Sequence, residues 1–149
     1  ENPLKQVHAT EYDDWMSARS DNGIVIHGDG GNDTLNVGAG DDVLDGGTGN
    51  DYLSGGIGND TYIFEIGYGS DIVEDTDGEN NVILNRLTLD MIEFNVNEYG
   101  DLLVSINGSE DVLTIRSFDP ELFTFEFADG VIGMVSAEMA EFIQIISKE

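Results

Sequence analysis

Apolar residues in the middle of the chain recur every nine positions, and this spacing predicts a series of short strands. One large apolar side chain stands at the centre of each unit, at Leu35, Leu44, Leu53, Tyr62 and, after a two-residue insertion at Phe64-Glu65, Val73. Because successive side chains of a strand point to opposite faces, each unit predicts a three-residue strand with one inward side chain. Two units then form one coil of 18 residues, with two apolar residues facing each other across a thin core.

The C-terminal part of the chain has a different pattern. Apolar and polar residues alternate with period two between residues 82 and 135, which predicts antiparallel strands joined by polar turns. The predicted strands are Met91–Val96, Leu102–Ile106, Val112–Phe118, Phe123–Phe127 and Val131–Val135. A short amphipathic helix is expected to begin at Ser136.

The N-terminal part offers a single clear strand, Ile24-Val25-Ile26, which lacks an aspartate loop of its own. The pattern therefore divides the chain into an N-terminal flank or cap (1–27), a repeat region (28–83) and a C-terminal capping flank (84–149). Aromatic residues in the two flanks are expected to form the cores of the caps, and if exposed they would form a partner surface. They are Trp15, Phe118, Phe123, Phe125 and Phe127.

Each nine-residue unit also has a glycine-rich half that ends in aspartate. Residues 28–78 hold 14 of the 19 glycines, so the tight turns that glycine allows are concentrated in this segment. The aspartates keep the same period and stand at Asp33, Asp42, Asp51, Asp60 and, after the insertion, Asp71. A degraded sixth unit, 75–83, has Asn80 where the aspartate is expected.

Such loops bring backbone carbonyls and one carboxylate into a small volume, and hard oxygen donors of this kind suit Ca²⁺ better than Mg²⁺. Loops 18 residues apart should stack, so Asp33 meets Asp51 and Asp42 meets Asp60, which predicts two well-specified sites. Two weaker stacks, Asp51 on Asp71 and Asp60 on Asn80, extend the prediction to about four sites. The residues expected to hold calcium are Gly28, Gly30, Asn32, Asp33, Gly38, Gly40, Asp42, Gly46, Gly47, Gly49, Asp51, Gly55, Gly56, Gly58, Asp60, Gly67, Gly69 and Asp71.

The formal net charge of −26 supports a cation as the partner. Nucleic acid, anionic lipid and phosphate-rich ligands would meet Coulomb repulsion, and no stretch is apolar enough to span a membrane. An EF-hand does not fit, because Gly78 comes two residues too early after Asp75 and Arg86 occupies the position of the calcium-binding glutamate. A phosphate-binding glycine loop lacks its basic residue. His8 and His27 lie in no catalytic spacing, so an enzyme is not expected.

The repeat units resemble the nonapeptide GGxGxDxUx of RTX (repeats-in-toxin) proteins. GGTGNDYLS (46–54) and GGIGNDTYI (55–63) match every defined position, whereas Asp29 and Val37 replace glycine in the first two units. The segments GGIGNDTYIFEIGYGSDIVE, DLLVSINGSEDVLTI and FEFADG are similar to the last repeat block and following flank of RTX cytolysins. The resemblance implies an all-β fold: a parallel β-roll with calcium in its turns, a β-rich C-terminal cap and the short terminal helix.

The same resemblance implies a protein exported by a type I secretion system of a Gram-negative bacterium, monomeric and extracellular. In such proteins the flank caps the roll and starts its folding outside the cell. Because residue 1 is Glu, we expect a piece of a longer or processed polypeptide.

Two functions remain open. The domain is either a calcium-responsive folding and secretion module without catalysis, or a ligand-binding (adhesin) module whose β-flank holds sugar or peptide. Buried flank aromatics favour the first function, and exposed ones favour the second.

Overall fold

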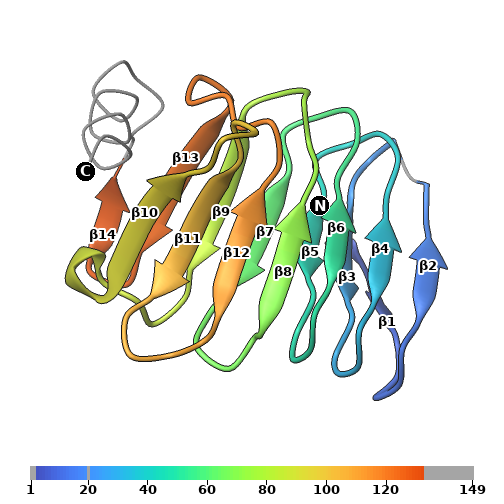
Figure 1. The fold of residues 1–149 in the computed structure, drawn as a ribbon. Helices are drawn as coiled ribbons and strands as arrows, with labels where there is room; N and C mark the ends of the chain where they lie inside the picture. The colour runs from blue at the N-terminus through green and yellow to red at the C-terminus, as the bar shows by residue number, and fades with distance from the viewer. Residues whose placement is uncertain (1–2, 20, 133–149) are drawn as a thin grey trace.

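The structure, a computed structural model, describes residues 3–19 and 21–132. The chain winds between two seven-stranded sheets that face each other, so that most consecutive strands lie in opposite sheets (Figure 1). Pairing within the repeat region is parallel throughout. The all-β fold, a parallel β-roll extended by a β-rich flank, confirms the predicted fold class.

The strands of the first sheet, in spatial order, are β1 (Lys5–His8), β3 (Ile24–His27), β5 (Val43–Asp45), β7 (Thr61–Phe64), β9 (Asn80–Leu84), β13 (Phe123–Phe127) and β14 (Gly130–Ile132). Those of the second sheet are β10 (Ile92–Val96), β11 (Leu102–Ile106), β12 (Val112–Ile115), β8 (Ser70–Val73), β6 (Tyr52–Ser54), β4 (Thr34–Asn36) and β2 (Trp15–Ser17). A short 3₁₀ turn, η1 (Leu89–Met91), precedes β10.

The core of the roll consists of two columns of inward side chains, as the nine-residue spacing predicts. Residues 18 apart pair within each sheet, and the two-residue insertion lengthens this spacing to 20 for the pair Leu53 and Val73. The paired residues, which are Ile26, Leu44 and Tyr62 in the first sheet and Leu35, Leu53 and Val73 in the second, are all fully buried. Strands β4, β5 and β6 thus contribute one buried side chain each to a continuous core, and β7 contributes two, Tyr62 and Phe64.

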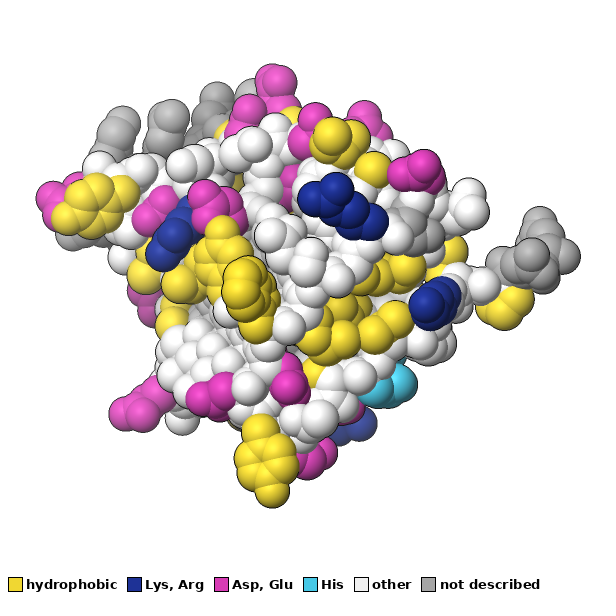
Figure 2. Space-filling view, turned by 90° about the vertical axis from the view of Figure 1, so that its right-hand side faces the viewer, with side chains coloured by type: hydrophobic (Ala, Val, Ile, Leu, Met, Phe, Trp, Pro, Cys, Tyr) yellow, Lys and Arg dark blue, Asp and Glu magenta, His cyan; other side chains and the backbone are white. Residues whose placement is uncertain are grey.

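The N-terminal segment adds a coil that the sequence pattern did not reveal. Strand β1 pairs in parallel with β3, and β2 pairs with β4. Met16 aligns with the buried Leu35, so Trp15 points outward and is 82% exposed. The expectation that Trp15 lies in a cap core is therefore wrong. Among the described strands β1 and β2 are edge strands, and Figure 2 shows apolar side chains on this end of the roll, with acidic, basic and histidine side chains around them.

The C-terminal flank is not wholly antiparallel, contrary to the prediction. Strands β10, β11 and β12 are antiparallel neighbours, but β12 pairs in parallel with β8, and β13 pairs in parallel with β9. Strands β12 and β13 therefore add another coil to the roll. Alternation with period two reveals which face of a strand is buried but not the direction of its neighbour, which explains the error.

The flank strands otherwise lie close to their predicted positions. β11 and β13 have the predicted bounds, and β10 begins one residue late, after η1. β12 ends at Ile115 because the chain turns at Ser117, whose φ is 48°. Residues 133–135 of the last predicted strand and the helix expected after Ser136 lie outside the described residues.

The phenylalanines expected in the core of the C-terminal cap lie there, whereas Tyr99, in the turn before β11, is 77% exposed. Phe123, Phe125 and Phe127 are buried, and Phe118 packs against them with a ring centroid 5.7 Å from that of Phe123. The ring of Phe94 meets that of Phe125 edge-on at 5.5 Å. This arrangement confirms the expectation for these phenylalanines and does not favour an aromatic ligand-binding surface on the flank.

Candidate metal centre

The predicted stacking of aspartates is present along both edges of the roll. The backbone N–H of Asp33 donates to Oδ1 of Asp51 at 2.8 Å, and that of Asp42 donates to Oδ1 of Asp60 at 2.9 Å. Each carboxylate therefore uses one oxygen to hold the preceding coil in register. We call Asp33, Asp42, Asp51, Asp60 and Asp71 the aspartate ladder.

The two stacks across the insertion form in the same way. The N–H of Asp51 donates to Oδ1 of Asp71 at 3.0 Å, and the N–H of Asp60 donates to Oδ1 of Asn80 at 2.9 Å. All four predicted stacks are therefore present, and the inserted residues do not interrupt the ladder.

The second oxygen of every ladder carboxylate is buried and has no hydrogen-bond partner. These aspartates are only 1–2% exposed. The ion pairs of the described residues do not reach them, since they join His8 to Asp29, His27 to Asp45 and Arg116 to Glu74. A buried carboxylate without a partner raises the free energy of the folded state. The five unpartnered oxygens lie in two rows and provide places where cations can bind.

Burial raises the pKa of each ladder carboxyl group. The pKa reaches about 7 for Asp51, about 7 for Asp60, where neighbouring Asp75 adds to the effect, and about 8 for Asp71. The pKa values of Asp33 and Asp42 are also raised, mainly by burial. A bound divalent ion would reverse these shifts because it favours the charged form.

The glycines allow adjacent turns to approach without intervening side chains. Gly49 has a φ of 116°, and a Cβ on it would lie 1.9 Å from the carbonyl oxygen of Gly31 in the preceding coil. The same close approach to a preceding carbonyl occurs at Gly47, Gly56, Gly58 and Gly69, over Asp29, Gly38, Gly40 and Gly49. Backbone carbonyls are therefore held directly between stacked turns.

The first glycine of three units lies against the unpartnered carboxylate oxygen of the same unit. A Cβ on Gly28, Gly46 or Gly55 would lie within 2.5 Å of Oδ2 of Asp33, Asp51 or Asp60 respectively. Any side chain there would fill the space beside the carboxylate. Glycine is therefore required at the first position both for the turn to form and for the carboxylate to lie where it does.

Four predicted glycines also contact residues outside the repeats. Gly30 lies beside the carboxylate of Glu11, and Gly38 beside the side chain of Arg19. Gly67 donates its N–H to Oδ2 of Asp111, and Gly69 donates to Oδ1 of the same carboxylate, both at 2.9 Å. Asp111 lies in the C-terminal flank just before β12, so the flank holds the last complete glycine loop directly, a contact that the sequence did not predict.

A second ladder runs beside the first and was also missed. Oδ1 of Asn32 accepts the N–H of Asn50, and Oδ1 of Asn50 accepts that of Ser70, at 2.8 and 2.9 Å. On the other edge, Oδ1 of Asp41 accepts the N–H of Asn59 at 2.9 Å. The signal was an amide or carboxylate side chain before the aspartate in each of the first four units. Of this row, the sequence predicts only Asn32 as a calcium residue, and its amide oxygen also links two coils.

The donor set fits calcium. Among residues 3–19 and 21–132, no three acidic or histidine side chains gather around one point. An ion between stacked turns would therefore take one or two carboxylates and complete its shell with backbone carbonyls. Calcium accepts such flexible sets of about six to eight oxygens, whereas transition metals prefer imidazole or thiolate ligands.

Comparison with protein families agrees with this geometry. Residues 27–62 match the RTX calcium-binding nonapeptide repeat in four copies. These are RTX repeats. Residues 101–132 match a second family, the haemolysin-type calcium binding protein related domain. The RTX repeats therefore occupy the part of the roll that contains the first four ladder aspartates, and the second family covers β11 to β14 of the flank.

A solved structure shares the fold of most of the chain. The extracellular lipase LipA from Serratia marcescens aligns with 74% of this chain at a TM-score of 0.54 and 23% sequence identity. The chain corresponds to 18% of the length of the lipase chain. None of the curated proteins compared matches the chain. Within the described residues, no helix has the length and apolar character needed to cross a membrane.

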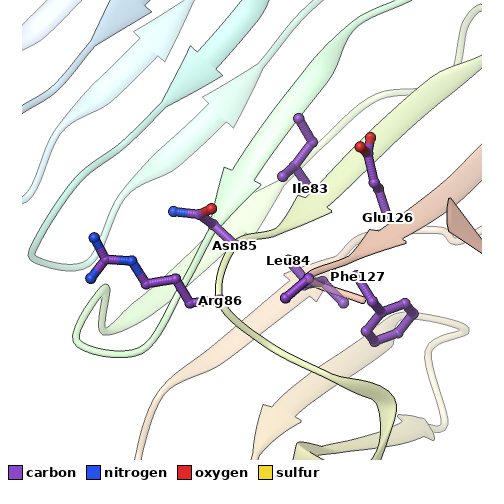
Figure 3. Close-up of a pocket in the computed structure, with 7 residues that line it drawn as sticks. Ile83, Leu84, Asn85, Arg86, Glu126 and Phe127 are labelled. Carbon is purple, nitrogen blue, oxygen red and sulfur yellow. The ribbon is translucent and has the colours of Figure 1, made fainter. Parts of the chain in front are cut away.

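The flank also borders a hollow of about 330 Å³ at the C-terminal ends of the paired strands β9 and β13 (Figure 3). Arg86 and Glu126 lie at its wall, and Figure 3 shows their side chains well apart and not pointing toward each other. The polar groups do not converge on one ligand position, as they do in specific small-molecule sites. The ligand-binding alternative for the flank is therefore not favoured.

Charge removal at Asp51 should weaken calcium binding more than charge removal at Asp33. Asp51 lies between two glycine loops, whereas the loop before Asp33 ends in Asp14, whose carboxylate already accepts the N–H and hydroxyl of Thr10. We expect Asp51→Asn to raise the calcium midpoint of folding by about tenfold, and Asp33→Asn by clearly less. Asparagine keeps the Oδ1 acceptor, as Asn80 shows. Equal midpoints in calcium titrations of the two variants would contradict the stacking scheme.

Proposed function

We propose that the chain is a calcium-responsive folding module that carries no catalysis of its own. The observation that carries this proposal is the row of buried ladder carboxylates, each with an oxygen that has no partner. Without an ion these charges repel each other and lack solvation, so the folded β-roll is disfavoured. Calcium supplies the missing partner, and its binding free energy becomes folding free energy.

The best-specified ions would lie between the turns of Asp33 and Asp51 and between those of Asp42 and Asp60. Glycine carbonyls and the unpartnered Oδ2 atoms would provide the ligands. Further ions at Asp71 and at the Asn80 turn would bring the total to about four. A bound ion would supply only charge neutralisation and coordination, while the chain's own ladder hydrogen bonds set the spacing of the coils.

We further propose that the module belongs to a protein secreted by a type I system, and that it folds in the calcium-rich medium outside the cell. The RTX repeats and the similarity in fold to an extracellular lipase support this assignment. An unfolded, strongly negative chain at low calcium and a compact one at high calcium would suit export followed by folding. We expect the folded module to be monomeric and the secretion machinery to be its partner in the producing cell.

Calcium should convert the chain from a largely disordered state to a β-rich one. We expect far-UV circular dichroism of the chelated chain to show little β structure, and millimolar calcium to restore it. Magnesium should substitute poorly because it demands a stricter octahedron and retains its waters. A spectrum that is the same with chelator and with calcium would refute the proposal.

A further inference from the structure

The turn at residues 75–80 departs from the other turns of the roll at two positions. Asn80 replaces the ladder aspartate, and Asp75 replaces the first glycine of the unit, which is Gly46 or Gly55 in the complete repeats. Oδ1 of Asn80 accepts the N–H of Asp60, and its Nδ2 donates to the carbonyl of Asp77 at 2.9 Å. The Asn80 side chain therefore stacks like an aspartate but has no second carboxylate oxygen to offer an ion.

The carboxylate of Asp75 lies close to the place where this charge is missing. Asp75 is 4% exposed and lies next to Asp60, whose Oδ2 has no partner. A Cβ on Gly55 would lie 2.2 Å from that Oδ2 and 2.6 Å from the hydroxyl oxygen of Tyr62. The carboxylate of Asp60, the Tyr62 hydroxyl and the carboxylate of Asp75 thus gather beside one glycine.

Tyr62 fixes the position of Asp75. Its ring occupies the inward position that leucine holds in the three preceding units, and its hydroxyl is fully buried. The hydroxyl donates to Oδ2 of Asp75 at 2.5 Å and accepts the N–H of Gly55 at 2.8 Å. Oδ1 of Asp75 accepts the N–H of Asp77 at 3.1 Å. Each oxygen of Asp75 keeps further lone pairs for a cation.

The surroundings are suited to the entry of a cation. No ion pair of the described residues involves Asp60 or Asp75. The turn borders a hollow of about 440 Å³ whose wall includes Glu74, Asp75 and Asp77. Two adjacent buried carboxylates without a basic partner are stabilised by a bound cation, and the acidic wall would attract one.

We propose that Asp75 is a calcium ligand, which together with Asp60 forms a variant site where the carboxylate of residue 80 is missing. The Tyr62 hydroxyl is the positioning group of this site. Asp75 restores the pair of negative charges that the other stacked turns obtain from two ladder aspartates. The inference rests on the proposed calcium function and assigns a role to a residue outside the nonapeptide pattern.

The test is to count bound calcium ions on the full chain by equilibrium dialysis, at a calcium concentration that just saturates the unmodified chain. Asp75→Asn removes the charge but keeps an oxygen that can accept the Tyr62 hydroxyl, so it should bind one ion fewer. Adding Asn80→Asp should restore that ion by returning the second carboxylate to its ladder position. Tyr62→Phe should still bind this ion, but with about tenfold lower affinity. Glu79→Gln, an equal charge change at an exposed neighbour, is the control and should change nothing.

Each outcome decides the proposal. Unchanged ion number and affinity in Asp75→Asn would overturn it, and so would a loss that Asn80→Asp fails to restore, because the charge of Asp75 would then not stand in for that of a ladder aspartate. If Asp75→Asn does not fold, folding of the double variant with the full number of ions supports the site, and its failure to fold overturns it. Absence of calcium from the unmodified chain would instead refute the proposed function itself.

Discussion

A chain that ends at Leu84 is expected to remain unfolded at calcium concentrations that fold the whole domain. It keeps every complete glycine and aspartate loop but loses β12 and β13, which pair with β8 and β9. It also loses the carboxylate of Asp111, which holds the N–H groups of Gly67 and Gly69. The last coil would expose two sheet edges and much of its apolar core, and nucleation of short coils would lack a stable neighbour. Circular dichroism during calcium titration measures the difference.

Removal of residues 1–10 provides the matched control for this truncation. It also deletes a paired strand, β1, but the side chains of β1 are exposed except for the half-buried Val7. Much less apolar area is lost, so the calcium midpoint should change only slightly. If the chain ending at Leu84 gains β structure at the same midpoint as the full chain, the flank is a passive neighbour of the roll.

Acidification should promote the β-roll in calcium-free solution. The pKa values of Asp51, Asp60 and Asp71 rise from the usual 3.8 to about 7, 7 and 8 in the folded state, so folding takes up protons. The stabilisation of the folded state by this proton uptake is fully present below pH 3.8 and is lost as pH rises through 7–8. The pKa values of Asp14 and Asp111 are lowered instead, and their contribution is lost in strong acid. Calcium-free β structure should therefore be greatest near pH 4.

The isosteric variant Asp51→Asn tests the cause of this pH dependence. It removes one group that must be protonated for folding, so its calcium-free β structure should persist to higher pH than that of the unmodified chain. Protons and calcium bind the same oxygens, and both favour the folded state. The calcium midpoint of folding of the unmodified chain should therefore fall as pH falls, while the affinity of the folded chain for calcium decreases. Calcium-free circular dichroism that is constant from pH 4 to pH 8 would show that burial of the ladder carboxylates does not control folding.

The repeat spacing was sufficient to predict the roll because one physical constraint repeats without change. A buried leucine and a turn aspartate recur every nine residues. Together they determine where each strand lies, how long a coil is and which residues stack, as Leu35, Leu53 and Asp51 show. The first coil was missed because residues 5–19 contain no glycine. Its signals were indirect: Asp14 precedes Asp33 by 19 residues, and Met16 precedes Leu35 by the same spacing.

The contacts that join different parts of the chain could not be predicted from periodicity. The pairing of Tyr62 with Asp75 spans 13 residues, and that of Asp111 with Gly67 spans 44, so neither follows the repeat. Both depend on how the chain leaves the last complete repeat and returns to it. Hydrophobic alternation gave the buried faces of β12 and β13 but carried no signal for their parallel alignment with β8 and β9.

The edges of β1 and β2, which are unpaired among the described strands, also affect how copies of this chain meet in solution. Unpaired strand edges beside apolar side chains would make a neutral protein prone to edge-to-edge association. The net charge of −26 opposes such encounters, and the proposed calcium ions, about four with two charges each, would reduce it only to about −18. Mutual repulsion would therefore persist after folding, so colloidal stability is provided by the acidic surface rather than by a closed sheet edge.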